Sequence, residues 1–300
     1  MAITHRPYGK DPQGKPVTEY TMTNAQGASV SVIDFGGTIT RICVPDRNGG
    51  RTDVCLGYDS AEPYAGSVGS MGALIGRVGN RIGQACFELE GATYALDKNN
   101  SARHSLHGGF KGYHQRMWKL KPQHGKEGDE LVCTLVSPDG DQGYPGELRI
   151  TVTYVWNDAC ELCIRYVAET DRTTLFNPTN HAYFNLNGHA SGSIEGHTLT
   201  IHADAITAVD ADLIPSGVLQ CLDGKPYDFR QPKRIGDALA HNAEDEMLGY
   251  GGGVDFNYCV GFDRIMKSAA LLYGPATGIE MEVLTDLPGV QIYTGNGLHG

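Results

Sequence analysis

The chain has 300 residues, 40% of them hydrophobic and 20% charged, so it can bury a large core and is not expected to be intrinsically disordered. Thirty-five acidic residues oppose 24 basic ones, and the net charge of −11 would repel a nucleic-acid backbone. The apolar runs fall well short of the roughly 20 residues that span a bilayer, and the N-terminus lacks the apolar block of a signal peptide. We therefore expect a cytoplasmic protein that binds neither nucleic acid nor membrane.

Short apolar runs with period two alternate with turn residues along the chain, which is typical of β-strands. In chain order, strands are expected at residues 29–35, 131–136, 149–156, 161–168, 197–203, 279–284 and 290–294. Because the turn residues Asn157 and Asp158 separate two of these runs, residues 149–168 are predicted to form an antiparallel hairpin. Residues 234–241 could form two helical turns at most, and the glycine-rich residues 249–253 are predicted to be a loop.

Many strands without crossover helices predict antiparallel sheets that pack face to face. The expected fold class is therefore all-β, with a large antiparallel β-sandwich. No change of composition, long linker or fixed repeat interrupts the sequence, which favours a single domain over residues 1–300.

Several common kinds of site have no support in the sequence. The phosphate-binding patterns GxGxxG and GxxxxGK[ST] and the hydrolase pattern GxSxG do not occur in a suitable setting. Cys160 and Cys163 form a CxxC in a strand-like run, where the odd spacing sends their thiols to opposite faces. His104, His107 and His114 lie close in sequence, but no zinc-binding pattern accompanies them. We predict no metal and no cofactor.

Four polar segments stand out from apolar or turn-rich surroundings. They are residues 76–81, residues 105–109, residues 177–186, and residues 253–258 taken together with 289–296. Each alone has an ordinary structural explanation, such as solvated arginines or an exposed loop histidine. Together they supply Arg, His, Asp, Asn, Gln and Tyr, whose planar groups make directional hydrogen bonds while aromatic faces cover C–H surface. This set favours a neutral, polyhydroxylated ligand.

The same segments resemble those of the aldose 1-epimerase (galactose mutarotase) family. The resemblance is carried, in order along nearly the whole chain, by LGYD at 56–59, GRVGNRI at 76–82, SLHGG at 105–109, NPTNHAYFNL at 177–186, Asp255, and GVQIYTGN at 289–296. It implies a large antiparallel β-sandwich of galactose mutarotase type. It also implies an isomerase that interconverts the α and β anomers of free hexoses such as galactose and glucose, without cofactor or metal.

The resemblance also assigns roles to residues. It implies that His181 is the general acid that protonates the ring oxygen, and that His107 and Arg81 stabilise the developing charge. Asn80, Tyr183, Asp255 and Gln291 would orient the sugar hydroxyls. The expected partner is a small-molecule aldose, and the expected assembly is a monomer or a homodimer.

One feature of the family pattern has no counterpart in this sequence. The resemblance implies a base glutamate in a Leu-Glu-Thr-Gln-like segment beyond the YTGN motif, and the sequence ends at Gly300. We therefore expect either a fragment that lacks the family's C-terminal strands or a sugar-binding protein with weakened catalysis; Glu280 and Glu282 are weak substitutes for the base. Two alternative functions remain open, a non-catalytic carbohydrate-binding module on the same fold and a hexose-6-phosphate 1-epimerase.

Overall fold

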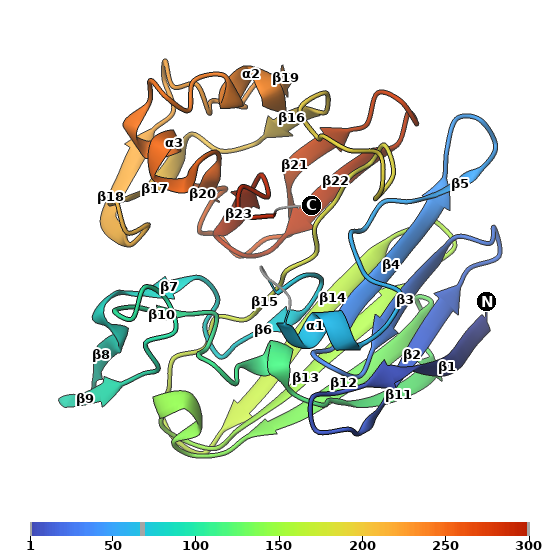
Figure 1. Ribbon diagram of the computed structural model, residues 1–300, viewed down its shortest axis with the longest axis horizontal. Coiled ribbons are helices and arrows are strands. Elements are labelled where there is room, and N and C mark those ends of the chain that lie inside the picture. The colour runs from blue at the N-terminus through green and yellow to red at the C-terminus, as the bar shows by residue number, and fades with distance from the viewer. Residues whose placement is uncertain (1, 67–69, 299–300) are drawn as a thin grey trace. The chain divides into compact units, whose positions relative to one another are not determined.

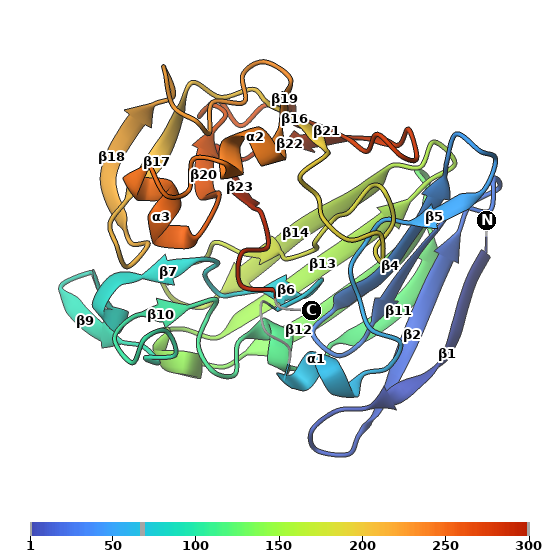
Figure 2. The same ribbon diagram turned by 45° about the horizontal axis from the view of Figure 1, so that its top comes forward.

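The computed structural model describes residues 2–66 and 70–298, which form two compact units (Figures 1 and 2). Unit 1 consists of Met1–Val44 and Cys55–Phe184, and unit 2 consists of Pro45–Val54 and Asn185–Gly300. Because residues 45–54 belong to unit 2, the chain enters that unit twice. The expectation of a single domain over residues 1–300 stays a prediction.

Strands dominate both units, and the helices are short. In unit 1 the elements are β1 (Ala2–Lys10), β2 (Pro16–Thr23), β3 (Ser29–Ile33), β4 (Thr38–Pro45), α1 (Glu62–Gly66), β6 (Leu74–Ile75), β7 (Arg81–Ile82), η1 (Gly83–Ala85), β8 (Cys86–Leu89), β9 (Ala92–Ala95), β10 (Ser105–Leu106), η2 (Tyr113–Gln115), β11 (Lys119–His124), β12 (Asp129–Ser137), η3 (Asp141–Gly143), β13 (Leu148–Trp156), β14 (Leu162–Thr170) and β15 (Thr179–Asn180). In unit 2 they are β5 (Arg51–Asp53), β16 (Thr198–Ile201), β17 (Ala205–Val209), β18 (Pro215–Cys221), β19 (Lys233–Arg234), α2 (Ile235–Leu239), α3 (Glu246–Gly251), β20 (Asp255–Cys259), β21 (Lys267–Tyr273), β22 (Glu280–Thr285) and β23 (Gly289–Tyr293). None of the helices in the described parts of the chain is long and apolar enough to serve as a membrane span.

Unit 1 is built on two antiparallel sheets. Within unit 1, one has the strand order β1-β2-β3-β4 and the other β11-β12-β13-β14. In β13 the alternate residues Ile150, Val152 and Tyr154 are at most 1% exposed, as their period-two spacing predicts. The Tyr154 hydroxyl and the Trp156 ring nitrogen donate hydrogen bonds to backbone carbonyls beside the first sheet, at 2.7 and 3.1 Å. These bonds join the two sheets of the predicted sandwich.

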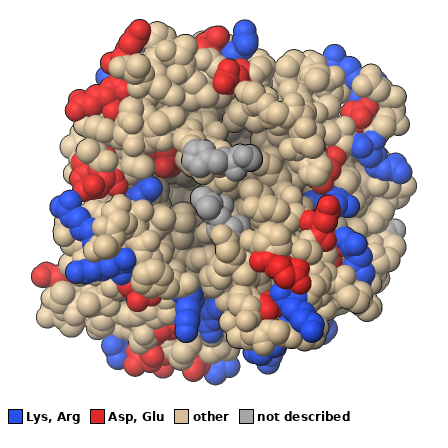
Figure 3. Space-filling view, viewed as in Figure 1, with Lys and Arg blue, Asp and Glu red and all other residues tan. Residues whose placement is uncertain are grey.

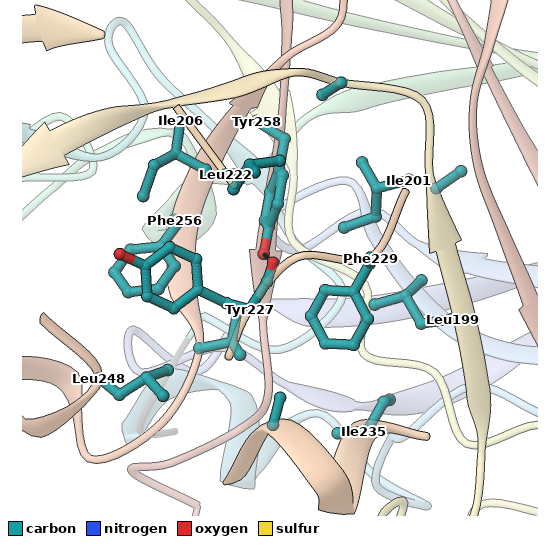
Figure 4. Packing of buried hydrophobic residues seen from close by; sticks show 14 residues of the cluster. Leu199, Ile201, Ile206, Leu222, Tyr227, Phe229, Ile235, Leu248, Phe256 and Tyr258 are labelled. Atoms are coloured by element: carbon teal, nitrogen blue, oxygen red, sulfur yellow. Dashed lines mark hydrogen bonds between the residues drawn. The ribbon is translucent and has the colours of Figure 1, made fainter. Parts of the chain in front are cut away.

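Unit 2 contains two further antiparallel sheets, of order β19-β16-β21-β22 and β18-β17-β20-β23. Its core combines residues of both sheets with residues of α2 and α3 (Figure 4). Tyr227, Phe256 and Tyr258 are fully buried there, and Leu248 of α3 packs against them. Figure 3 shows one face of the molecule, on which acidic and basic side chains are interspersed without a continuous basic patch.

The structure confirms the all-β fold class and the expected strands, including the hairpin of β13 and β14. The prediction of a loop over residues 249–253 is wrong in part, because α3 extends to Gly251. Asp245 starts this helix by accepting hydrogen bonds from the amides of Met247 and Leu248, and Gly252 ends it in the left-handed region. The prediction that Cys160 and Cys163 both lie in a strand is also wrong. Cys160 lies in the turn before β14, at φ 60°.

Candidate functional site

The histidine loop of unit 1 is held by a short strand pair. β7 and β10 pair antiparallel, so Asn80, before β7, lies beside His107, after β10. The His107 amide donates to the Asn80 carbonyl at 3.0 Å, and the Asn80 amide donates to His107 Nδ1 at 3.1 Å. Because Nδ1 accepts a hydrogen bond, neutral His107 carries its proton on Nε2. The His107 ring is therefore a hydrogen-bond donor through Nε2.

The turn after His107 requires glycine. Gly108 has φ +82°, and a Cβ atom built there would lie 1.8 Å from the Gly76 carbonyl oxygen. No side chain fits at that distance, so the SLHGG segment can pass this close to the backbone only with glycine at position 108.

His181 is fixed by its backbone on the neighbouring strand. β15 pairs with β6, and the His181 amide donates to the Ala73 carbonyl at 2.9 Å, while the Gly72 amide donates to the His181 carbonyl at 2.9 Å. The Asn180 side chain reinforces this arrangement, because it donates to the Gly72 carbonyl and accepts from the Ala182 amide. The His181 backbone is thus held at a strand edge rather than in a free loop.

The predicted residues of unit 1 form one cluster. The His181 ring meets the His107 ring edge-on, with 5.0 Å between centroids and 88° between planes, and lies 5.0 Å from the Tyr183 ring. Arg81 Nη1 donates to Asn80 Oδ1 at 3.2 Å. The structure therefore brings together the five site residues that the sequence predicts in this unit.

Burial controls the protonation of two imidazoles in this cluster. Burial, and then the charges of His181, His114 and Arg81, lower the pKa of His107 well below its usual value. Burial, and then the charge of His181, lower the pKa of His114 to about 4. At neutral pH both rings are neutral.

His114 also belongs to this cluster, although sequence analysis considered it only as a metal ligand and rejected that role. Its spacing of seven residues from His107, across a glycine-rich turn, is the one signal that could have indicated the neighbourhood. No group of His, Cys, Asp and Glu side chains in residues 2–66 and 70–298 is arranged to hold a metal ion.

The two site residues predicted in unit 2 also lie together. Asp255 on β20 and Gln291 on β23 share a sheet face, because β20 and β23 pair with Asn257 opposite Gln291. Gln291 Nε2 donates to Asp255 Oδ1 at 2.7 Å. Phe256 points to the opposite face, into the core, as strand alternation predicts.

Glu280 and Glu282, the weak substitutes for a base, are both exposed on β22. That strand belongs to the other sheet of unit 2, whereas β20 and β23 carry Asp255 and Gln291. The sheet topology thus gives no support to either glutamate as a base at the site.

Comparison with known proteins gives a consistent result. The family model described as Aldose 1-epimerase matches residues 18–300. The chain is 39% identical to a galactose mutarotase of Rattus norvegicus over 300 residues, which cover all of this chain and 84% of the relative. It is 33% identical to an aldose 1-epimerase of Escherichia coli (strain K12), with 96% of this chain and 82% of the relative covered.

Solved structures with the same architecture are also found. A galactose 1-epimerase from Lactobacillus acidophilus NCFM superposes with a TM-score of 0.85 at 27% identity, over 99% of this chain and 83% of that one. An aldose epimerase homologue from C. elegans gives a TM-score of 0.81 at 30% identity, over 90% and 79% of the two chains.

Proposed function

The chain belongs to the aldose 1-epimerase family, and from this premise we propose that His181 is the general acid of anomer interconversion on free hexoses such as galactose and glucose. The chain is an isomerase of aldoses. The finer assignments of substrate and residue roles are our proposal.

The reaction needs one proton to arrive and another to leave. The ring oxygen takes a proton from the acid while the C1 hydroxyl loses its proton to a base, and the bond between C1 and the ring oxygen breaks to give the open aldehyde. Rotation about the C1–C2 bond and closure by the reverse proton transfers give the other anomer. General acid and base groups each contribute typically about 10²- to 10⁴-fold to such a reaction.

One observation supports His181 as the acid. Three imidazoles lie in the cluster of unit 1, and the lowered pKa values of His107 and His114 keep those two neutral. A neutral imidazole has no easily released proton, so His181 is the remaining candidate for the donor. His107, whose Nε2 carries hydrogen, instead fits a donor that stabilises charge developing near the ring oxygen.

The other predicted residues act as binding groups in this proposal. Arg81 adds a positive charge beside His107, and Tyr183 offers an aromatic face next to His181. Within unit 2, Asp255 and Gln291 pair a carboxylate acceptor with an amide, the kinds of polar group that bind hydroxyls.

Polarimetry of freshly dissolved α-galactose tests the proposal. We expect the protein in its full-length form to accelerate the decay of optical rotation, and His181→Asn to lower kcat/KM by about 10²- to 10⁴-fold. His5→Asn, which makes the same change at an exposed histidine of unit 1, is the matched control and should keep full activity.

Other outcomes would favour the alternatives. Calorimetric binding of galactose with decay at the buffer rate would indicate a binding module and contradict the catalytic proposal. Faster turnover of a hexose 6-phosphate than of the free hexose would contradict the proposed substrate class.

A further inference from the structure

His114 lies directly beside the loop that carries His107. It is in η2, and its ring packs against Gly112, since a Cβ atom built on Gly112 would lie 3.1 Å from both Cε1 and Nδ1 of His114. The same Cβ atom would lie 2.6 Å from the His107 carbonyl oxygen. One glycine therefore separates the His107 backbone from the His114 imidazole. His114 also lies within electrostatic range of His181.

The two nitrogens of the His114 ring have different surroundings. Nδ1 is sealed from solvent and has no hydrogen-bond partner among residues 2–66 and 70–298, whereas the side chain as a whole is partly exposed. A proton on Nδ1 would be a buried donor without an acceptor, which costs free energy. The neutral ring therefore favours the tautomer with its proton on Nε2. Among residues 2–66 and 70–298 no acceptor faces Nε2–H, and the side chain is partly exposed, so this donor is available to a ligand.

We propose that His114 is a third imidazole of the sugar site and that its Nε2–H donates a hydrogen bond to one hydroxyl group of the bound aldose. This inference rests on the proposed function, because it takes the cluster of His107 and His181 to be the sugar site. The ligand group is a neutral hydroxyl, because an uncharged ring gives a directional hydrogen bond but no ion pair to an anion. His114 would then contribute to the choice among hexoses rather than to proton transfer.

Calorimetric binding of a series of deoxygalactoses tests this role. We compare galactose with its 2-, 3-, 4- and 6-deoxy analogues for the unchanged chain and for His114→Phe. Against galactose, His114→Phe should raise Kd by roughly 3- to 10-fold, the range for one net hydrogen bond. For one deoxy analogue, the one that lacks the partner hydroxyl, the two proteins should bind with equal Kd. An equal increase in Kd for all five sugars would overturn the inference, because a purely structural role does not single out one hydroxyl.

A spectroscopic measurement on the unchanged chain covers the case in which His114→Phe does not fold. In a protein labelled with ¹⁵N-histidine, His114 should show the Nε2–H tautomer, and its Nε2 resonance should shift on saturation with galactose. A proton on Nδ1, or an Nε2 resonance that saturation leaves in place, would overturn the inference.

Binding and catalysis are measured separately in these experiments. If the deoxy series singles out one hydroxyl while polarimetry shows no acceleration, the inference about His114 holds and the catalytic proposal fails. If polarimetry shows acceleration and the series singles out no hydroxyl, the inference fails and the catalytic proposal stands.

Discussion

The backbone of Asn80 determines which nitrogen of His107 carries the proton. Asn80 has φ 60°, and this left-handed conformation accompanies the hydrogen bond from its amide to His107 Nδ1. The Asn80 side chain meanwhile accepts a hydrogen bond from Arg81. A residue that the sequence suggests as a sugar ligand thus also sets the tautomer of its neighbour. Such a backbone role depends on a conformation that side-chain identity does not reveal.

The stability of unit 1 should depend on pH through His114. Its pKa is about 4 in the folded chain and about 6.5 when unfolded, so between these values the unfolded chain binds a proton that the folded chain excludes. Stability from this group is present above about pH 6.5 and is lost as the pH falls toward 4. At about 1.4 kcal/mol per pH unit, the loss reaches about 2 kcal/mol by pH 5.

Urea unfolding at pH 7.5 and pH 5 measures this dependence. His114→Asn should reduce the difference in unfolding free energy between the two pH values by about 2 kcal/mol. His5→Asn controls for the loss of one exposed imidazole. An unchanged difference in His114→Asn would show that the ring does not exclude a proton on folding.

At the scale of elements, strand periodicity was sufficient to predict the sheets but not the short paired segments that carry the site. In β13, buried residues alternate with less buried ones from Leu148 to Tyr154, and in β23 Val290 and Ile292 pack against the core while Gln291 is exposed; both patterns are visible in the sequence. β6, β7, β10 and β15 have two residues each, too few for any periodicity. Their pairing depends on contacts between residues far apart in the sequence. The resemblance to a family therefore supplied the site residues, whereas the fold followed from local pattern.

The close approach of Gly108 to Gly76 can be tested with a pair of glycine substitutions. Gly108 and Gly140 have nearly the same φ, +82° and +79°, but a Cβ atom at Gly140 would have nothing within 4 Å. Alanine at either site should lower the free energy of unfolding by about 1–2 kcal/mol, because the left-handed conformation is unfavourable for a residue with a Cβ atom. Gly108→Ala must also move the backbone at Gly76, which should cost about 1–3 kcal/mol more.

Urea unfolding and polarimetry together separate these two effects. Gly108→Ala should be the less stable variant and should lose activity, because the displaced turn carries His107. Gly140→Ala should keep its activity. Equal stabilities for the two variants would mean that the turn relaxes without strain.

At the scale of the whole molecule, the division into units follows no boundary that the sequence shows. Residues 45–54 lie between segments of unit 1 yet bond to unit 2: the Arg47 amide donates to the Thr277 carbonyl, and the Asn185 amide donates to the Val54 carbonyl. Arg47 also donates to the Tyr273 hydroxyl at 2.8 Å. The composition of these ten residues does not differ from that of their neighbours, so nothing in the sequence indicates that they belong to unit 2. For this reason sequence analysis favoured one uninterrupted domain.

Net charge should make the enzyme discriminate against phosphorylated sugars. The chain carries −11 at pH 7, and its field repels a hexose 6-phosphate dianion but not a neutral hexose. Salt screens this repulsion, since the Debye length shrinks from about 20 Å at about 0.02 M to about 6 Å at about 0.3 M. Over that range, kcat/KM for any residual turnover of hexose 6-phosphate should rise severalfold, while kcat/KM for galactose stays constant as the internal control. A site built for phosphate would hold clustered arginine or lysine, and its kcat/KM would fall with salt. A decrease in kcat/KM for hexose 6-phosphate with rising salt would thus show that local positive charge outweighs the net charge of the molecule.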